Sequence, residues 1–166
     1  SPFLKDLSDI GYSVPTPIQG ETIPAALQGS DILGMAQTGT GKTAAFILPI
    51  LQRLNANQVE NRFRDPRVLI LAPTRELVIQ INDSIRQYGK YIALKHTVIF
   101  GGVKQDPQVK LLNKGLDIIV ATPGRLLDLI NQGFTSLNKI QFFVLDEADR
   151  MLDMGFIRDV EKIIKL

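Results

Sequence analysis

Five short apolar runs recur along this chain of 166 residues and limit the folds that it can adopt. They are too apolar on both faces for a half-exposed antiparallel sheet, so they favour parallel strands covered on each side. The runs are Ile32–Met35, Val68–Leu71, Thr97–Phe100, Ile118–Val120 and Phe142–Leu145. Helical patterns separate them. This alternation predicts one α/β domain, a mostly parallel sheet with helices on both faces.

Apolar stripes at helical spacing predict where the helices lie. One stripe, opened by Thr74 as N-cap and closed by Gly89, consists of Val78, Ile81, Ile85 and Tyr88. Three others are Phe3–Ile10, Leu126–Ile130 and Phe156–Ile163. The polar stretch Asn55–Arg67 predicts an exposed connection. Both ends of the sequence suggest a piece cut from a longer protein, since no initiator Met opens it and the last stripe has no cap.

Composition excludes several classes of protein. The chain has no cysteine, so disulfides and thiolate metal sites are excluded. No apolar run is long enough to cross a membrane, and we expect a cytoplasmic protein. The net charge of +2 is too small to argue for nucleic-acid binding. His96, the only histidine, is interpreted as a structural residue at a strand edge.

A glycine-rich stretch, AQTGTGKTAAF, follows the first apolar run. Its glycines would let backbone amides turn towards a phosphate chain, Lys42 would reach the β- and γ-phosphates, and the Thr43 hydroxyl would ligate Mg²⁺. The predicted nucleotide loop comprises Ala36, Gln37, Thr38, Gly39, Thr40, Gly41, Lys42 and Thr43. Ala36 stands where the strict pattern has glycine. The alternative is a glycine-rich turn with a surface lysine.

Three carboxylates follow the last apolar run, at Asp146, Glu147 and Asp149. Crowded carboxylates are unfavourable unless they are solvated or hold a cation. Asp146 would emerge at the carboxyl edge of the sheet and provide a second Mg²⁺ ligand, while Glu147 would act as a base or position the attacking water. The alternative is a solvated acidic loop that begins a helix, with Asp149 paired to Arg150 or Arg158.

Together these motifs resemble the DEAD-box ATP-dependent RNA helicases. Asp146-Glu147-Ala148-Asp149 is the motif that names this family, and the rest of the chain is similar to its first RecA-like domain. GYSVPTPIQ (11–19) is similar to the Q motif, APTREL (72–77) to motif Ia, Gly101-Gly102 to the double-glycine element and TPGR (122–125) to motif Ib. The motif MLDMGF that follows also resembles the bacterial RhlE-type branch.

The resemblance implies roles that spacing alone does not. Gln19 would recognise adenine and so favour ATP, and Asp149 would couple the two domains. An RNA backbone would lie, with little sequence preference, on Thr74, Arg75, Gly101, Gly102, Thr122, Gly124 and Arg125. Each has a plainer alternative: Gln19 as a surface residue, the arginines as solvated charges, the glycines as a turn.

Residues 1–166 would then be an incomplete first domain. The Ser-Ala-Thr motif and the second RecA-like domain, with its arginine finger, do not occur in the sequence, so we expect a strand edge to be exposed and the isolated chain to hydrolyse hardly any ATP. The intact protein would unwind RNA locally or, alternatively, act as an ATP-dependent RNA clamp. A GTPase is disfavoured because no Asn-Lys-x-Asp run occurs. A small-molecule kinase or a DNA helicase fits less well.

Overall fold

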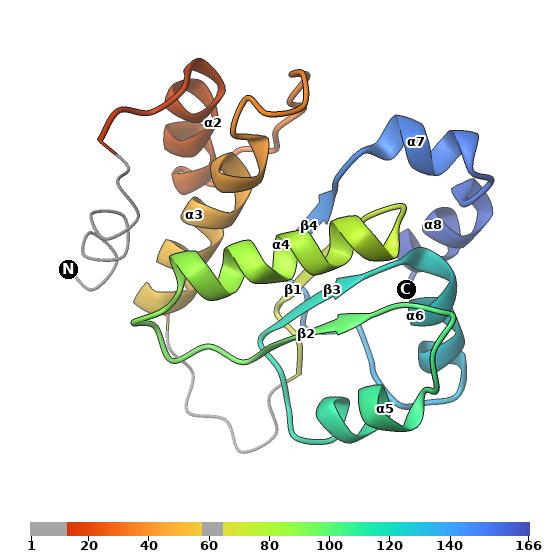
Figure 1. Ribbon diagram of the computed structural model, residues 1–166. Coiled ribbons are helices and arrows are strands. Elements are labelled where there is room, and N and C mark those ends of the chain that lie inside the picture. Colours follow the sequence, from red (N-terminus) through yellow and green to blue (C-terminus); the bar gives the residue numbers. More distant parts are fainter. Residues whose placement is uncertain (1–12, 58–64) are drawn as a thin grey trace. The chain divides into compact units, whose positions relative to one another are not determined.

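The computed structural model describes residues 13–57 and 65–166 (Figure 1). The chain folds into two compact units. We call Ser1–Glu60 with Asp83–Ala93 the helical unit, and Asn61–Asn82 with Leu94–Leu166 the sheet unit. Helix α4 (Arg75–Tyr88) contributes residues to both. The predicted stripe Phe3–Ile10 lies outside the described residues.

The sheet unit contains four parallel strands in the order β2-β3-β1-β4. They are β1 (Val68–Leu71), β2 (His96–Ile99), β3 (Ile118–Ala121) and β4 (Phe142–Leu145). The predicted strands β1 and β4 have the predicted bounds, β2 lies one residue earlier, and β3 is one residue longer. The predicted α/β fold with a parallel sheet is therefore confirmed.

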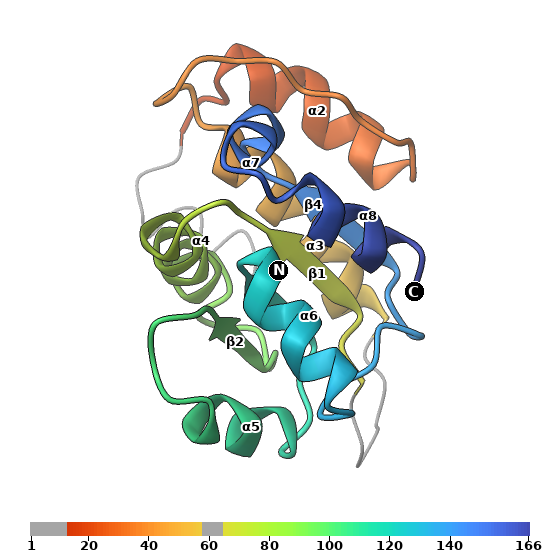
Figure 2. The ribbon, with the colours of Figure 1, turned by 90° about the vertical axis from the view of Figure 1, so that its right-hand side faces the viewer.

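The core of the sheet unit lies between one face of the sheet and three helices. These are α6 (Pro123–Asn131), α7 (Ala148–Asp153) and α8 (Ile157–Ile164). Leu69, Leu71 and Ile119 of the strands form one apolar cluster with Leu126 of α6 and Val160 of α8. Figure 2 shows α8 and the start of α4 on opposite sides of β1.

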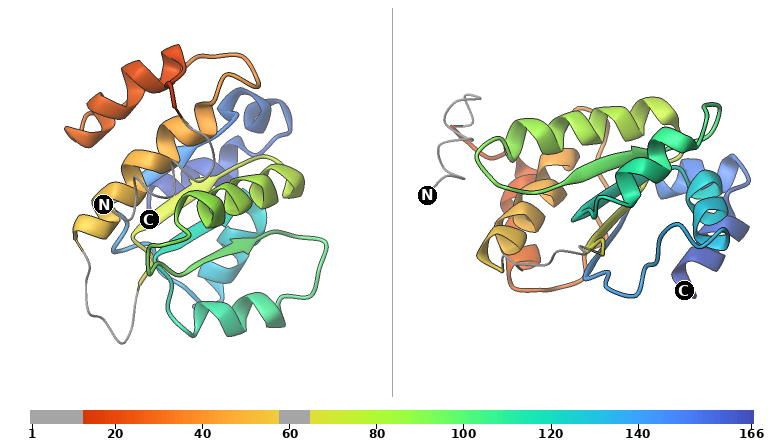
Figure 3. Two further views of the ribbon diagram at one scale, coloured as in Figure 1. Left: turned by 60° about the vertical axis from the view of Figure 1, so that its left-hand side comes forward. Right: turned by 90° about the horizontal axis from the view of Figure 1, so that it is seen from below.

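The predicted helical stripes form as expected where the structure describes them. In α4 the four stripe residues Val78, Ile81, Ile85 and Tyr88 are all buried. The Thr74 hydroxyl accepts a hydrogen bond from the Leu77 amide at 3.2 Å, which confirms the predicted cap. A further helix, α5 (Asp106–Leu112), was not predicted, and it packs beside β2 (Figure 3).

The helical unit contains α2 (Pro17–Leu27) and α3 (Lys42–Ala56). The two helices pack against each other, and Arg53 of α3 donates a hydrogen bond to the Ala26 carbonyl at 3.3 Å. Because α3 extends to Ala56, the predicted connection from Asn55 begins too early. It also ends too late, because Arg67 is buried.

The predicted strand Ile32–Met35 is wrong. These residues have no regular secondary structure, and Leu33 and Met35 are 90% and 87% exposed. Four apolar residues form a strand only when a neighbouring strand supplies hydrogen-bond partners, and the described sheet has no strand paired with this run. Gly34 also weakens the tendency to form one. At the edge strand β4, Phe143 and Leu145 are exposed.

The amino ends of three strands are joined by Asp117, which directly precedes β3. Its backbone carbonyl accepts the amides of Arg67 and Val68, and its own amide donates to the Lys95 carbonyl. Its carboxylate accepts the Arg67 guanidinium at 3.0 Å and the Lys95 amide at 2.9 Å. One buried residue therefore fixes how β1, β2 and β3 start relative to one another.

No described helix combines the length and the apolar character needed to cross a bilayer.

We expect Asp117→Ala to destabilise the domain by about 3 kcal/mol, because it leaves the Arg67 charge buried without this carboxylate. The matched control is Asp83→Ala, which breaks an exposed pair with Arg86 and should cost less than about 0.5 kcal/mol. Urea denaturation followed by circular dichroism measures both. Equal unfolding midpoints for the two variants would contradict the role given to Asp117.

Candidate functional site

The glycine-rich loop of the helical unit lies at the N-terminus of α3. Gly39 and Gly41 have φ values of +83° and +87°, a conformation that other residues adopt only at a cost. The Thr40 hydroxyl donates to the Gln37 carbonyl at 2.7 Å and closes the turn. Lys42 and Thr43 form the first turn of α3, where backbone N–H groups and the helix dipole favour an anion.

Gln19 faces this loop, and it is only 2% exposed. Its amide oxygen accepts the Thr16 N–H at 3.0 Å, and its amide nitrogen donates to the Gly41 carbonyl at 3.2 Å. A Cβ at position 41 would collide with that nitrogen. The plainer alternative of a surface residue is therefore wrong, and the side chain fastens α2 to the loop. Pro17 begins α2, as a helix entrance requires.

The strand register brings the other predicted residues to one edge of the sheet unit. Leu71, Ala121 and Leu145 are register partners, and Ile99 is paired with Ala121. All four strands therefore end at the same level. The segments that follow them are 72–75, 100–103, 122–125 and 146–149. These segments contain Thr74, Arg75, Gly101, Gly102, Thr122, Gly124, Arg125, Asp146, Glu147 and Asp149, so the structure brings these ten together.

The acidic segment turns sharply after β4. The Asp146 amide continues the ladder by donating to the Leu71 carbonyl at 2.9 Å. Glu147 then adopts φ +51°, ψ +50°, and it is the one residue other than glycine with positive φ in the described parts of the chain. Such a backbone costs roughly 1 kcal/mol, and strained residues of this kind cluster at functional sites. The left-handed residue thus forms the turn between β4 and α7.

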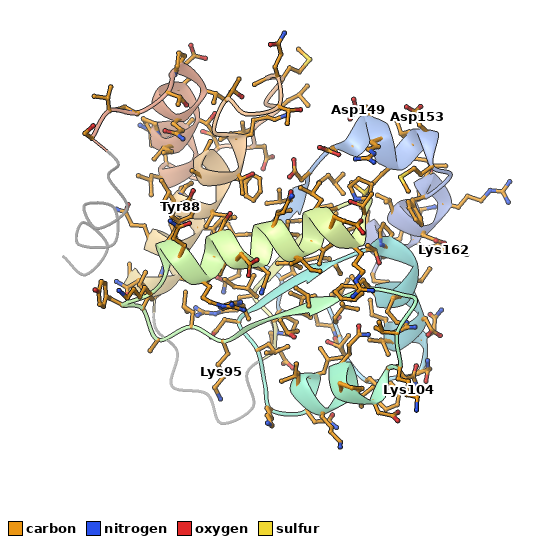
Figure 4. All side chains as sticks on the ribbon, viewed as in Figure 1. Tyr88, Lys95, Lys104, Asp149, Asp153 and Lys162 are labelled. Atoms are coloured by element: carbon orange, nitrogen blue, oxygen red, sulfur yellow. The ribbon has the colours of Figure 1, made fainter. Side chains whose placement is uncertain are left out.

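The carboxylates after β4 have separate surroundings. Glu147 pairs with Arg150 at 3.3 Å, so Arg150 pairs with Glu147 and not with Asp149. Asp149 is exposed on α7, where Figure 4 labels it with Asp153. The residues that the structure describes include no group of three or more His, Cys, Asp or Glu side chains able to hold a metal ion.

Residues 100–103, which we call the double-glycine loop, follow β2. Gly102 has φ +77° and needs glycine for that reason. At Gly101 no such requirement exists, since its φ is not in that region and an added Cβ would meet open space. The guanidinium of Arg75 lies over the Phe100 ring, 4.8 Å from its centroid. A cationic group and an uncovered backbone are thus adjacent.

Arg125 points inward, although a solvated charge was one interpretation of it. Its side chain is 17% exposed, and Nη2 donates to the Val103 carbonyl at 3.1 Å. Its Nη1 atom is buried without a hydrogen-bond partner among the described residues. Thr122 is the N-cap residue of α6, without a side-chain cap. Arg125 therefore connects α6 to the double-glycine loop.

Sequence reasoning missed one buried polar residue beside this loop. Gln108 of α5 is 7% exposed, and its amide hydrogen-bonds both backbone groups of Phe100. Asp106 followed by Pro107 is a helix-start signal that could have located α5. No feature of the sequence shows that Gln108 turns towards the sheet.

Comparison with known proteins identifies relatives over nearly the whole chain. Residues 16–166 match the family model of the DEAD/DEAH box helicases. The chain is 47% identical over 161 residues to DEAD-box ATP-dependent RNA helicase 20 of Oryza sativa subsp. japonica, covering 97% of this chain and 33% of that protein. It is 48% identical over 165 residues to ATP-dependent RNA helicase DeaD of Escherichia coli K12, covering 99% of this chain and 25% of that protein.

A solved structure is similar in both fold and sequence. The crystal structure of a hypothetical ATP-dependent RNA helicase from Sulfolobus tokodaii superposes with a TM-score of 0.88 at 36% identity. The match covers 99% of this chain and 46% of that one. The chain spans a third or less of the curated relatives named above.

We expect Glu147→Gly to stabilise the domain by about 0.5 kcal/mol, since relief of the left-handed conformation outweighs loss of the exposed Arg150 pair. Asp149→Gly is the control: it lies within α7, so glycine should destabilise there by about 1 kcal/mol. Thermal unfolding of both variants tests this. A fall in melting temperature for Glu147→Gly would show that the turn is not strained.

Proposed function

Because the chain belongs to the DEAD/DEAH box helicase family, we propose that it is the nucleotide-binding RecA-like domain of an ATP-dependent RNA helicase. The observation that carries this proposal is the convergence of the segments after four parallel strands at one edge of the sheet unit. That edge is where α/β sheets bind their ligands. In the intact, cytoplasmic protein, ATP hydrolysis would drive local separation of an RNA duplex.

The glycine-rich loop would bind the phosphates of ATP. Backbone N–H groups of residues 36–43 would face the phosphate oxygens, and the Lys42 ammonium would neutralise charge on the β- and γ-phosphates. The loop is exposed at Gln37, Thr38 and Gly39, so these backbone groups are open to a ligand. The chemistry needs no covalent step by the protein.

Magnesium is the metal that these residues would suit. The Thr43 hydroxyl and the Asp146 carboxylate are hard oxygen donors, and Mg²⁺ characteristically takes few protein ligands and completes its shell with phosphates and water. This accounts for the absence of a carboxylate cluster among the described residues. When bound, the ion would neutralise developing phosphate charge.

Glu147 would position the water that attacks the γ-phosphate. It follows Asp146 directly and has a left-handed backbone, and its side chain is partly exposed beside Arg150. One turn can therefore hold two carboxylates in two roles. Asp149, exposed on the next helix, would couple this domain to the second RecA-like domain of the intact protein.

The segments after β1, β2 and β3 would bind the RNA backbone. Folding of the chain explains glycine at position 102 but not at position 101, where a side chain would extend into open space. A ligand that approaches the backbone closely would explain it. Arg75, exposed beside the loop, provides a charge for a phosphate. Backbone contacts carry little sequence preference, so RNA of many sequences would bind.

We expect Lys42→Ala and Asp146→Asn each to reduce the RNA-stimulated ATPase rate of the full-length protein at least about 100-fold. Lys42 would neutralise phosphate charge directly, and Asp146 would hold the Mg²⁺ that does so. The exposed control Asp153→Asn, also after β4, should leave the rate within twofold. Phosphate release measured with a coupled assay decides this. Normal turnover in Lys42→Ala would exclude the proposed nucleotide site.

We expect the full-length protein to bind ADP more tightly than GDP, and Gln19→Ala to abolish that preference. Gln19 also donates a hydrogen bond to the Gly41 carbonyl, so Gln19→Ala could disturb the loop itself. Binding of pyrophosphate, which has no base, must therefore be measured as well. Calorimetry on the three ligands separates the two effects. If all three weaken equally and the ADP preference persists, Gln19 supports the loop and does not recognise adenine.

A further inference from the structure

Gln108 of α5 holds the start of the double-glycine loop with both ends of its amide. The Phe100 N–H donates to Oε1 at 3.1 Å, and Nε2 donates to the Phe100 carbonyl at 3.1 Å. These are the two bonds that a neighbouring strand would make with Phe100. On the open edge of β2, a buried side chain thereby takes the place of a strand at one residue, immediately before Gly101.

Phe100, which Gln108 holds, also contacts the cationic group of Arg75. The Phe100 ring lies beneath the guanidinium of Arg75, so fixing the Phe100 backbone also fixes the surface on which Arg75 rests. The arginine side chain has several rotatable bonds, so an exposed arginine is ordered only when a neighbouring group restricts its side chain. Gln108 therefore acts on Gly101 through the chain and on Arg75 through the ring.

The other end of the loop is held from a different helix. Arg125 of α6 donates to the Val103 carbonyl at 3.1 Å. Gly101 and Gly102 thus lie between two fixed residues, and neither glycine has a neighbouring atom within 4 Å of an added Cβ. Without these restraints the two glycines would be the most flexible part of the edge. The arrangement keeps an open backbone surface in one shape.

We propose that Gln108 is a positioning residue for RNA binding, which sets the double-glycine loop and Arg75 before RNA arrives. This inference rests on the proposed function, because it requires that Arg75 and Gly101 contact RNA. A loop that is ordered in advance loses less conformational entropy on binding, so its ligand binds more tightly. Gln108 itself is buried and touches no RNA.

The test is Gln108→Met in the full-length protein, which keeps the volume and removes both hydrogen bonds. The readouts are the oligouridylate concentration that half-saturates ATPase stimulation, the KM for ATP and the rate at saturation. We expect the first to rise about five- to tenfold, as the loss of two preorganising bonds implies, while the other two stay within twofold. Gln108→Asn keeps an uncharged amide but is one methylene shorter, so it cannot make both hydrogen bonds to Phe100; it should change the same quantity in the same direction and serves if Gln108→Met does not fold.

Two controls separate positioning from general stability. Gln132→Met also removes two amide hydrogen bonds, to Gln105, at the end of α6. Val160→Ala creates a cavity in the core of the same unit. Neither should change half-saturation by RNA. If Val160→Ala, at an equal loss of melting temperature, weakens RNA as much as Gln108→Met, the positioning role is overturned.

Arg75→Ala distinguishes failure of this inference from failure of the proposed function. If Arg75→Ala weakens RNA and Gln108→Met does not, only the inference fails. If neither has an effect, the RNA surface itself is wrong. If Gln108→Met weakens RNA and Arg75→Ala does not, Gln108 acts elsewhere and the inference also fails. If both weaken RNA, the double variant should weaken it by less than the product of the single effects, since Gln108 acts partly through Arg75.

Discussion

The buried residue Asp117 is the constraint on which the edge of the sheet unit depends. Parallel strands gain no register from a tight turn, because long crossover connections separate them. Here one carboxylate and its own peptide groups join the starts of β1, β2 and β3. With the starts fixed and each strand four residues long, the ends must coincide. The loops after these three strands, which we propose bind RNA, are thus placed by an interaction at the opposite end of the strands.

The local sequence pattern was enough to predict those helices and strands whose position depends mainly on their own residues. The stripe from Val78 to Tyr88 gave α4 and its cap, and apolar runs gave β1 and β4 with correct bounds. The Ile32–Met35 prediction failed because a strand forms only when a second strand pairs with it, and the sequence of the run does not show whether such a partner exists. Gln108 was missed for a similar reason: a glutamine looks the same in sequence whether it faces water or a carbonyl. The predicted edge residues came together because parallel strands leave no other place for their carboxyl ends.

Two backbone features of the edge are not what stability alone would select. Glu147 adopts a left-handed conformation that glycine would adopt at lower cost, and Gly101 occupies a position where a larger residue would fit. In each case the residue that folding favours is absent, and the residue present is the one that the proposed function requires. The two deviations lie on segments that follow β4 and β2, at the same level of the sheet. Selection for stable folding alone does not explain why both deviations occur at the same edge of the sheet.

The glycine at position 101 has a further consequence. An open backbone surface is useful to a ligand only if it keeps its shape, and glycine is the residue least able to keep it. Residues outside the two glycines hold the loop in shape: Gln108 fixes Phe100 before the glycines, and Arg125 fixes Val103 after them. A buried amide is well suited to the first task, since it can donate and accept on one residue and so leaves neither Phe100 backbone group without a partner. The openness of the surface and its rigidity are therefore supplied by different residues on different elements, and the proposed RNA-backbone site would require both.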